Sequence, residues 1–493
     1  MKIGFDKEKY LQLQTAAILK RINMFGDKLY LEFGGKLFDD YHASRVLPGF
    51  DPDLKIRLLE KLKDKAEVIF TIGADDIEKK KVRADLGITY DLDLLRIIDD
   101  MKKRRIIVNS VVITKYNNQN SADKFILKLK KNNITVYTHK YIEGYPFCID
   151  TILSDNGFGA NDYIVTSKPL VIVTAPGPGS GKLSVCLSQC YNDNKNNIKA
   201  GYAKFETFPV WNLPLKHPVN LAYETATADL DDVNMIDSFH LDKYGITTVN
   251  YNRDLEVFPI LKKILFNIYG KDIYYSPTDM GVNMIGNCII DDEIIINASK
   301  KEILRRSCNA ILDNRLGICT TQTVQKIEVI LNYLNIVKED RTVVVEALKK
   351  QEITLRSSMA LELSNEVIIT GKTTDVMTAP ASLILNAVKY LCHLDDEIHL
   401  LSHDILEPMI KYKKKIFNQD ILTLQEVILA LSVCATTNPL AQITLNKLSS
   451  LKGLDSHSTT MLCISDQNTL RTLGITYTCE PIMFSDKLYD STI

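Results

Sequence analysis

The chain has 493 residues, 45% of them hydrophobic and 25% charged, a composition typical of a folded globular protein with room for several domains. Its 60 basic and 61 acidic residues nearly cancel, which argues against nucleic acid or a membrane surface as the partner. The sequence lacks a run of about 18 apolar residues, a signal-peptide core and any C-x-x-C pair among its ten cysteines. We therefore expect a cytoplasmic protein with reduced thiols.

Through the first 300 residues, short apolar runs alternate with amphipathic stretches, which is typical of an α/β fold with a mostly parallel sheet and flanking helices. The expected strands are Leu29–Phe33, Glu67–Gly73, Ile106–Thr114, Ile134–Thr138 and Leu170–Thr174. The expected helices are Asp51–Lys65, Leu92–Lys103, Ala122–Asn132 and one that begins near Ser180 or Gly181. In such sheets, ligands bind beyond the carboxyl ends of the strands.

From about residue 300, apolar stripes at helical spacing predict a helical region with one short strand, Val367–Thr370. The last 60 or so residues return to an α/β pattern, with Pro439–Leu451 and Asp466–Leu473 as helices and His457–Ile464 and Ile475–Cys479 as strands. We therefore predict α/β domains over 1–165 and 166–300, a helical domain over 301–425 and a small C-terminal α/β segment over 426–493.

The most informative segment is the turn that follows Leu170–Thr174, which carries Gly177, Gly179, Gly181 and Lys182. A strand, a Gly-rich turn, a lysine and a helix start together form an arrangement that holds phosphate, because backbone N–H groups, the helix dipole and the ammonium all favour an anion. The match to G-x-x-x-x-G-K-[ST] is incomplete, since the hydroxyl that would hold magnesium arrives one residue late at Ser184. Ordinary P-loop ATP hydrolysis is therefore not expected. A tight turn with a solvated lysine is the structural alternative.

Three polar segments follow in the same region, within 222–240, 250–254 and 275–281. Carboxylates, amides and an arginine bind magnesium, ribose or phosphate, and they also form helix caps and turns. As one site, Arg253 would help to neutralise phosphate. A general base or magnesium ligand would come from Asp229, Asp254 or Asp279.

Four other patterns allow a functional and a structural interpretation. The segment from Gly34 to His42 combines Lys36 with Asp39, Asp40 and His42, groups suited to acid–base work or to a capped turn. The run Ile289–Glu293 resembles a Walker B strand and is interpreted as structural, and His457–Thr460 is explained by a strand start. His399 and His403 stand at i,i+4, a spacing that would bind zinc on one helix face.

Several of these segments together resemble a bacterial family of unknown function, domain of unknown function 1846. The resemblance rests on 34–53, 84–91, 175–182, 226–240, 250–254, 276–283 and 454–459, and it spans nearly the whole chain. It implies a cytoplasmic α/β protein with a helical insert or appendage that self-associates.

The sequence thus favours a protein that binds a phosphorylated or nucleotide-like small molecule and acts on it as an enzyme. A nucleotide with Mg²⁺ is the candidate cofactor, and we expect a homo-oligomer. A non-catalytic ligand-binding or assembly protein is the alternative, and a metallohydrolase that uses His399 and His403 is a third.

Overall fold

The computed structural model describes residues 3–83, 86–363 and 367–483. The chain divides into two compact units, an N-terminal unit over Lys2–Ser299 and a C-terminal unit that begins at Lys300. This boundary coincides with the position near residue 300 where the sequence changes from an α/β pattern to apolar stripes at helical spacing. Among the described residues, no helix combines the length and apolarity needed to cross a bilayer.

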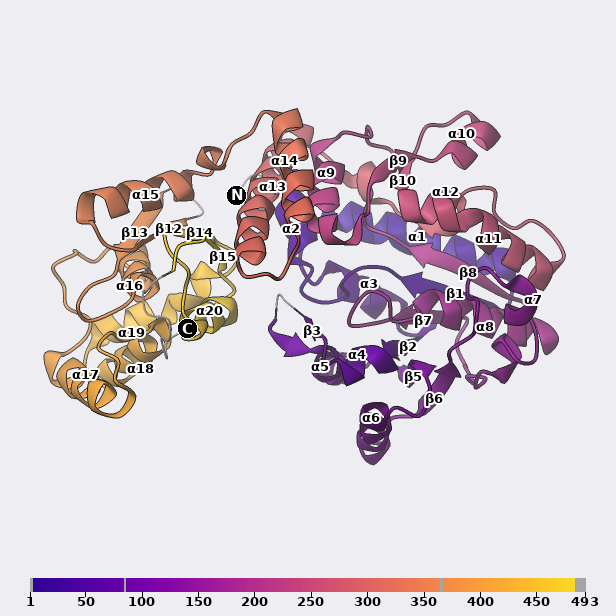
Figure 1. Ribbon diagram of the computed structural model, residues 1–493, viewed down its shortest axis with the longest axis horizontal. Coiled ribbons are helices and arrows are strands. Elements are labelled where there is room, and N and C mark those ends of the chain that lie inside the picture. Colours follow the sequence, from indigo (N-terminus) through magenta and orange to yellow (C-terminus); the bar gives the residue numbers. More distant parts are fainter. Residues whose placement is uncertain (1–2, 84–85, 364–366, 484–493) are drawn as a thin grey trace. The chain divides into compact units, whose positions relative to one another are not determined.

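The N-terminal unit is built on a parallel sheet whose described strands lie in the order β11-β8-β1-β7-β2-β5-β6 (Figure 1). Their bounds are Gly281–Val282, Ala200–Phe205, Lys28–Phe33, Leu170–Thr174, Ala66–Gly73, Val108–Tyr116 and Val136–Lys140 in that order. Each pairing along the sheet is parallel, which confirms the expected fold class. The segments 1–165 and 166–300, expected as separate domains, both contribute strands to this one sheet.

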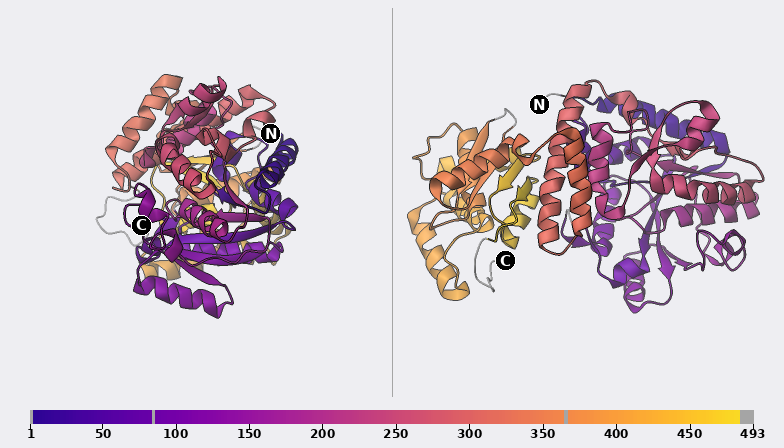
Figure 2. Two further views of the ribbon diagram at one scale, coloured as in Figure 1. Left: turned by 90° about the vertical axis from the view of Figure 1, so that its right-hand side faces the viewer. Right: turned by 45° about the horizontal axis from the view of Figure 1, so that its top comes forward.

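Helices cover both faces of this sheet (Figure 1, Figure 2). The longer ones are α1 Lys7–Phe25, α3 Leu54–Leu62, α5 Tyr90–Lys103, α6 Asn120–Lys131, α8 Lys182–Lys195, α9 Pro218–Ala226 and α11 Asn252–Tyr269. The shorter ones are α2 Tyr41–Val46, α4 Ala74–Glu78, α7 Ile149–Ile152, α10 Ser238–Tyr244 and α12 Pro277–Met280. The remaining strands are β3 Val82–Arg83, β4 Ile88–Thr89, β9 Asn234–Ile236 and β10 Val249–Tyr251, and the last two form an antiparallel pair.

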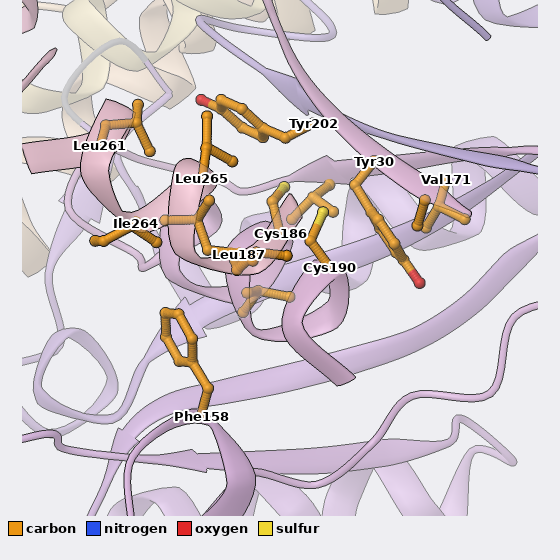
Figure 3. Packing of buried hydrophobic residues seen from close by; sticks show 14 of the residues in the cluster. Tyr30, Phe158, Val171, Cys186, Leu187, Cys190, Tyr202, Leu261, Ile264 and Leu265 are labelled. Carbon is orange, nitrogen blue, oxygen red and sulfur yellow. The ribbon is translucent and has the colours of Figure 1, made fainter. Parts of the chain in front are cut away.

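One core cluster fixes the position of α8 and α11 on the sheet (Figure 3). Because strand side chains alternate between faces, Tyr30 of β1 and Tyr202 of β8 point to the same side, where both helices pack. The apolar residues of this layer include Val171, Cys186, Leu187, Cys190, Leu261, Ile264 and Leu265. This packing sets the starts of α8 and α11 at the carboxyl edge of the sheet.

The C-terminal unit contains α14 Thr321–Leu334, α15 Thr342–Thr354, α16 Ala379–Leu391, α17 His403–Phe417, α18 Leu424–Cys434, α19 Pro439–Asn446 and α20 Ile464–Thr472. The helix α13 Asp292–Arg315 crosses the unit boundary. A small mixed sheet in the order β13-β12-β14-β15 joins Ile368–Lys372, Ser358–Glu362, Asp455–Ser458 and Thr476–Cys479. The segments 301–425 and 426–493 therefore share this sheet. Its strand β12 was not expected from the sequence.

Candidate functional site

The carboxyl ends of β7, β1 and β8 are adjacent in the sheet. The chain leaves β1 toward β2 and leaves β8 toward β11, so the connections of these two neighbouring strands run in opposite directions. At such a switch point the connections diverge beyond the strand ends, and open α/β sheets bind their ligands there. The Gly-rich turn after β7 borders this point on the far side of β1.

The conformation of the Gly-rich turn is set by its neighbours. A Cβ on Gly177 would lie 2.3 Å from Cε2 of Tyr90, and Gly181 has a φ of 81° with the Thr114 side chain 2.9 Å from its Cβ position. The Ser180 hydroxyl donates to the Gly177 carbonyl oxygen at 2.9 Å, and the Thr114 hydroxyl donates to the Ser180 carbonyl oxygen at 2.9 Å. Gly179 is exposed, with a φ of 72° and no atom within 4 Å of its Cβ position. Tyr90 and Thr114 thus pack against the turn at Gly177, Ser180 and Gly181, whereas Gly179 is exposed to solvent.

Lys182 is the first residue of α8, as the sequence predicted to within two residues, and its side chain is partly buried. Burial lowers the pKa of its ammonium group, and the nearby carboxylate of Glu32 only partly offsets that effect. Among the described residues, no carboxylate forms an ion pair with Lys182. The first amides of a helix have no partner within the helix. An anion placed here would meet a cation that has no ion-pair partner among the described residues, together with these amides.

Lys204 of β8 lies near three acids: Glu32 of β1, Asp254 of α11 and Glu206, which directly follows β8. Its Nζ lies 2.6 Å from Oε1 of Glu206 and 2.6 Å from Oδ2 of Asp254. The parallel register places Glu32 opposite Lys204, and the Tyr202 hydroxyl donates to Oε2 of Glu32 at 2.8 Å. Burial lowers the pKa of Lys204, but Asp254, Glu206 and Glu32 outweigh burial, so its net pKa is raised. Lys204 is therefore held charged at the centre of the edge.

Glu206 is the acid with the most perturbed environment in this cluster. Burial raises its pKa, Lys204 opposes that effect and Asp254 reinforces it, with a result of about 7. A carboxyl group that titrates near neutral pH can both donate and accept a proton under physiological conditions. Glu206 thus has the property expected of a general acid or base.

The first turn of α11 adds Arg253 and Asp254 to the same edge. The Arg253 Nη2 donates to Oδ2 of Asp232 at 3.1 Å, while the Arg253 side chain remains largely exposed. Burial raises the pKa of Asp232, and Arg253 partly opposes that shift. We call the set Glu32, Lys182, Lys204, Glu206, Asp232, Arg253 and Asp254 the edge cluster.

Of the residues proposed from the sequence, Lys182, Arg253 and Asp254 meet in the edge cluster. Asp279 of α12 has other partners, since its carboxylate accepts from the Tyr244 hydroxyl at 2.9 Å and from the Tyr275 amide at 3.0 Å. Asp229 is exposed on the short 3₁₀ turn Ala228–Leu230. No described contact links Asp229 or Asp279 to Lys182, so their catalytic roles stay predictions.

Sequence reasoning missed Glu32, Lys204 and Glu206. A signal was present, because each is a charged residue inside or directly after a short apolar strand, in Leu-Tyr-Leu-Glu-Phe and in Ala-Gly-Tyr-Ala-Lys-Phe-Glu. Charges are rarely buried in strands without a partner or a function. Their meeting depends on the β1–β8 register, which the sequence does not state.

The segment from Gly34 to His42 has structural contacts. Asp40 pairs with the buried Lys55 at 2.7 Å and caps α2 through the Ala43 amide, and Asp39 pairs with Arg96 at 3.0 Å. His42 packs edge-on against the rings of Phe208 and Tyr223. These contacts support the capped-turn interpretation.

The zinc spacing of His399 and His403 is not realised on one helix face, because α17 begins at His403 and His399 lies in the preceding loop. Both side chains are exposed, and His403 lies 3.5 Å from Glu407 of the same helix. Over the described ranges, no group of three or more His, Cys, Asp and Glu residues is arranged to hold a metal ion. The metallohydrolase hypothesis thus loses its helical metal site.

The two remaining patterns are explained by local structure. Asp291 caps the start of α13 by accepting from the Ile294 amide at 3.1 Å, so the Walker-B-like run is a helix start, in keeping with its structural interpretation. His457 is buried within β14, and its Nδ1 lies 2.8 Å from the Thr478 hydroxyl.

Comparison with known sequences identifies the family. Residues 3–335 match the domain of unknown function DUF1846, N-terminal, and residues 339–489 match the domain of unknown function DUF1846, C-terminal. Similar proteins include a UPF0371 protein of Clostridium botulinum (strain Alaska E43 / Type E3), 52% identical over 500 residues, and one of Clostridium tetani (strain Massachusetts / E88), 53% identical over 500 residues. Each alignment covers 99% of both chains. The chain therefore belongs to the DUF1846 family, which confirms the resemblance, and the function of that family is not established.

Proposed function

We propose that the protein binds a phosphorylated small molecule at the edge cluster, with the phosphate on Lys182 and the first amides of α8. The observation that carries the proposal is Lys182, which lacks an ion-pair partner among the described residues, at the end of a Gly-rich turn beside a topological switch point. The exposed guanidinium of Arg253 adds a second positive charge. Phosphate groups favour such a combination of helix amides with Lys and Arg side chains.

Glu206 favours an enzyme over a passive binding protein. Its pKa near 7 suits proton transfer, whereas a site that only held an anion would gain nothing from Glu206, Glu32 and Asp254 beside it. Lys204 and Asp254 would position Glu206. A Mg²⁺ ion, if used, would arrive with a nucleotide and be held largely by its phosphates. Binding without turnover of any phosphate ester would favour the non-catalytic alternative.

Calorimetric titration with pyrophosphate and with ADP tests the proposal. Lys182→Ala should weaken binding roughly 10- to 100-fold, since a charge-assisted contact contributes about 1.5–3 kcal/mol. The matched control is Lys195→Ala, in the last turn of the same helix, where the ammonium is exposed and pairs with Asp155 at 2.7 Å. Lys195→Ala should bind like wild type. Equal affinity of Lys182→Ala and wild type would rule the proposed phosphate site out.

A further inference from the structure

Beside the edge cluster, the segment 207–251 contains an unusual number of buried polar atoms with no hydrogen-bond partner among the described protein atoms. They are Thr207 Oγ1, Trp211 Nε1, Asp232 Oδ1, Asn234 Oδ1, Asn250 Nδ2 and the Tyr251 hydroxyl. Folded proteins leave few such atoms, because an unsatisfied buried donor or acceptor is costly. Asn250 is only 1% exposed and Tyr251 only 6%. This concentration gives the segment unused capacity to hydrogen-bond polar groups.

Tyr251 connects these atoms to the edge cluster. It caps the start of α11, two and three residues before Arg253 and Asp254, and it lies opposite Asn234 in the β9–β10 pair. Burial is the main cause that raises the pKa of Tyr251, and the charges of Glu206, Asp232 and Asp254 raise it further. Tyr251 therefore lies in the electrostatic neighbourhood of Glu206 and Asp254, the two acids that pair with Lys204.

Trp211 lies at the same edge. A Cβ on Gly281 would come 2.3 Å from Cζ2 of Trp211 and 3.3 Å from Oε2 of Glu206, so the indole and this carboxylate border one glycine. The indole ring that carries the unpaired Nε1 donor therefore lies near Glu206. The glycine at 281 leaves room for both groups.

A row of stacked rings accompanies the unpaired atoms. The rings of Phe208 and Tyr223 stack with centroids 5.0 Å apart, and those of Tyr223 and Tyr251 stack at 5.6 Å. Tyr223 is partly exposed, so the row is not wholly closed off. Flat aromatic faces next to a few placed polar groups are typical of small-molecule sites.

The mixture of unpaired donors and acceptors restricts the ligand. Trp211 Nε1 and Asn250 Nδ2 can only donate, whereas Asp232 Oδ1 and Asn234 Oδ1 can only accept. A hydroxyl group does both, so several hydroxyls on one ring could satisfy both kinds. A second phosphate would satisfy only the donors and would be repelled by Asp232, and an apolar group would satisfy neither.

We propose that the segment 207–251 binds the polyhydroxylated ring of a phosphorylated sugar, next to the phosphate position at Lys182. The inference rests on the proposed function, because it assumes that the phosphate occupies the edge cluster. A hexose phosphate and the ribose of a nucleotide share this chemistry.

Calorimetry with four probes tests the inference: glucose 1-phosphate, AMP, phenyl phosphate and pyrophosphate. Phenyl phosphate carries a ring without hydroxyls, so at least one of the two sugar phosphates should bind 10-fold or more tighter than phenyl phosphate. The tighter of the two identifies the hexose or the ribose source. Tyr251→Phe should reduce this preference about 10-fold and leave pyrophosphate binding unchanged.

Matched variants separate recognition from folding. Tyr10→Phe removes another buried, unpaired tyrosine hydroxyl that lies in the Phe5–Phe50 ring cluster, and it should keep the sugar preference. Trp211→Phe retains a ring, removes the indole donor and should reduce the preference again. If Tyr251→Phe fails to fold, Trp211→Phe gives the same test.

The outcomes distinguish the two proposals. Equal binding of phenyl phosphate and both sugar phosphates, or a preference unchanged in Tyr251→Phe and Trp211→Phe, would overturn the sugar inference while the phosphate site stands. Failure of all four probes to bind wild-type protein would overturn both. Tight sugar-phosphate binding that depends on Tyr251 but not on Lys182 would support the sugar subsite and refute the phosphate position.

Discussion

The two units each bury a group of charges, and they compensate them differently. In the C-terminal unit, Arg341 is 1% exposed and uses all three guanidinium nitrogens. Its Nη2 donates to both oxygens of Asp455 at 2.9 and 2.8 Å, its Nε donates to the same carboxylate at 3.3 Å, and its Nη1 donates to the Thr478 hydroxyl at 2.9 Å. Every guanidinium nitrogen of Arg341 thus donates to a partner within the protein.

In the edge cluster of the N-terminal unit, ion pairing and hydrogen bonding are incomplete. Lys204 is shared by two acids, Lys182 pairs with no described carboxylate, and Asp232 and Tyr251 retain unpaired atoms. Buried charges that are fully paired fix elements together, whereas incompletely paired ones keep interaction capacity and perturbed pKa values for a ligand. The contrast is consistent with a structural role for the Arg341 network and supports the proposal that the edge cluster binds a ligand.

The largest expected effect is on stability. Arg341→Met should lower the free energy of unfolding by about 3–5 kcal/mol, because it removes one partner of a buried ion pair. Lys182→Met should change it by less than about 1 kcal/mol, since it removes a partly buried cation that lacks an ion pair. Urea denaturation followed by circular dichroism measures both. Similar losses in the two variants would remove the distinction between the clusters.

The next effect is on how stability depends on pH, which should be opposite for Glu480 of the C-terminal unit and Glu206 of the edge cluster. The neighbouring imidazole of His457, whose Nε2 lies 3.3 Å from Oε1 of Glu480, is the main cause that lowers the pKa of Glu480 to about 2, with burial opposing it and Lys338 adding to it. A depressed pKa gives stability that is present above the unfolded value near 4.5 and lost as the pH falls toward 2. Glu480→Gln should therefore be roughly 2–3 kcal/mol less stable than wild type at pH 6, with the difference vanishing near pH 2.

Glu206 has the reverse sign. Its pKa is raised by burial to about 7, so the folded state binds its proton more tightly than the unfolded chain does. The resulting penalty is absent below about pH 4.5 and grows as the pH rises to about 7. Glu206→Gln should thus be roughly 1–3 kcal/mol more stable than wild type at pH 8 and equal to it at pH 4. Urea unfolding at these pH values is the measurement, and a destabilised Glu206→Gln at pH 8 would contradict the account.

The smallest effect concerns two glycines of one turn. Gly177→Ala should cost about 2 kcal/mol, because its Cβ would overlap the Tyr90 ring. Gly179→Ala should cost only about 1 kcal/mol, since it meets open space and pays only for the positive φ. Only Gly177→Ala should displace the turn and weaken pyrophosphate binding. Equal effects of the two variants on stability and binding would show that the turn is not held by Tyr90.

The sequence predicted five of the seven described strands of the parallel sheet, because a sheet covered on both faces needs continuous apolar runs such as Leu170–Thr174. It did not predict strand order, and this is why 1–165 and 166–300 were separated. The strand β12 was missed, since its pairing with β13 and β14 is set by tertiary contacts. The alternative zinc site at His399 and His403 assumed one helix through both residues, but α17 begins at His403, and sequence spacing alone does not locate a helix start.

For the candidate site, sequence reasoning proposed Lys182, Arg253 and Asp254, whose local patterns mark helix starts, and the structure places all three at the carboxyl edge of the sheet. It missed Lys204 and Glu206, because their significance comes from strand neighbours that are far away in the chain. Unpaired atoms such as Asn250 Nδ2 are invisible in a sequence, since an unmet hydrogen bond is a property of the packed structure.

A crystal structure of the protein soaked with pyrophosphate tests the central claim most directly. The account predicts phosphoryl oxygens within hydrogen-bond distance of Lys182 Nζ and of the first amides of α8, with Lys204 still between Glu206 and Asp254. Pyrophosphate bound elsewhere at saturating concentration, with only water at Lys182, would contradict it.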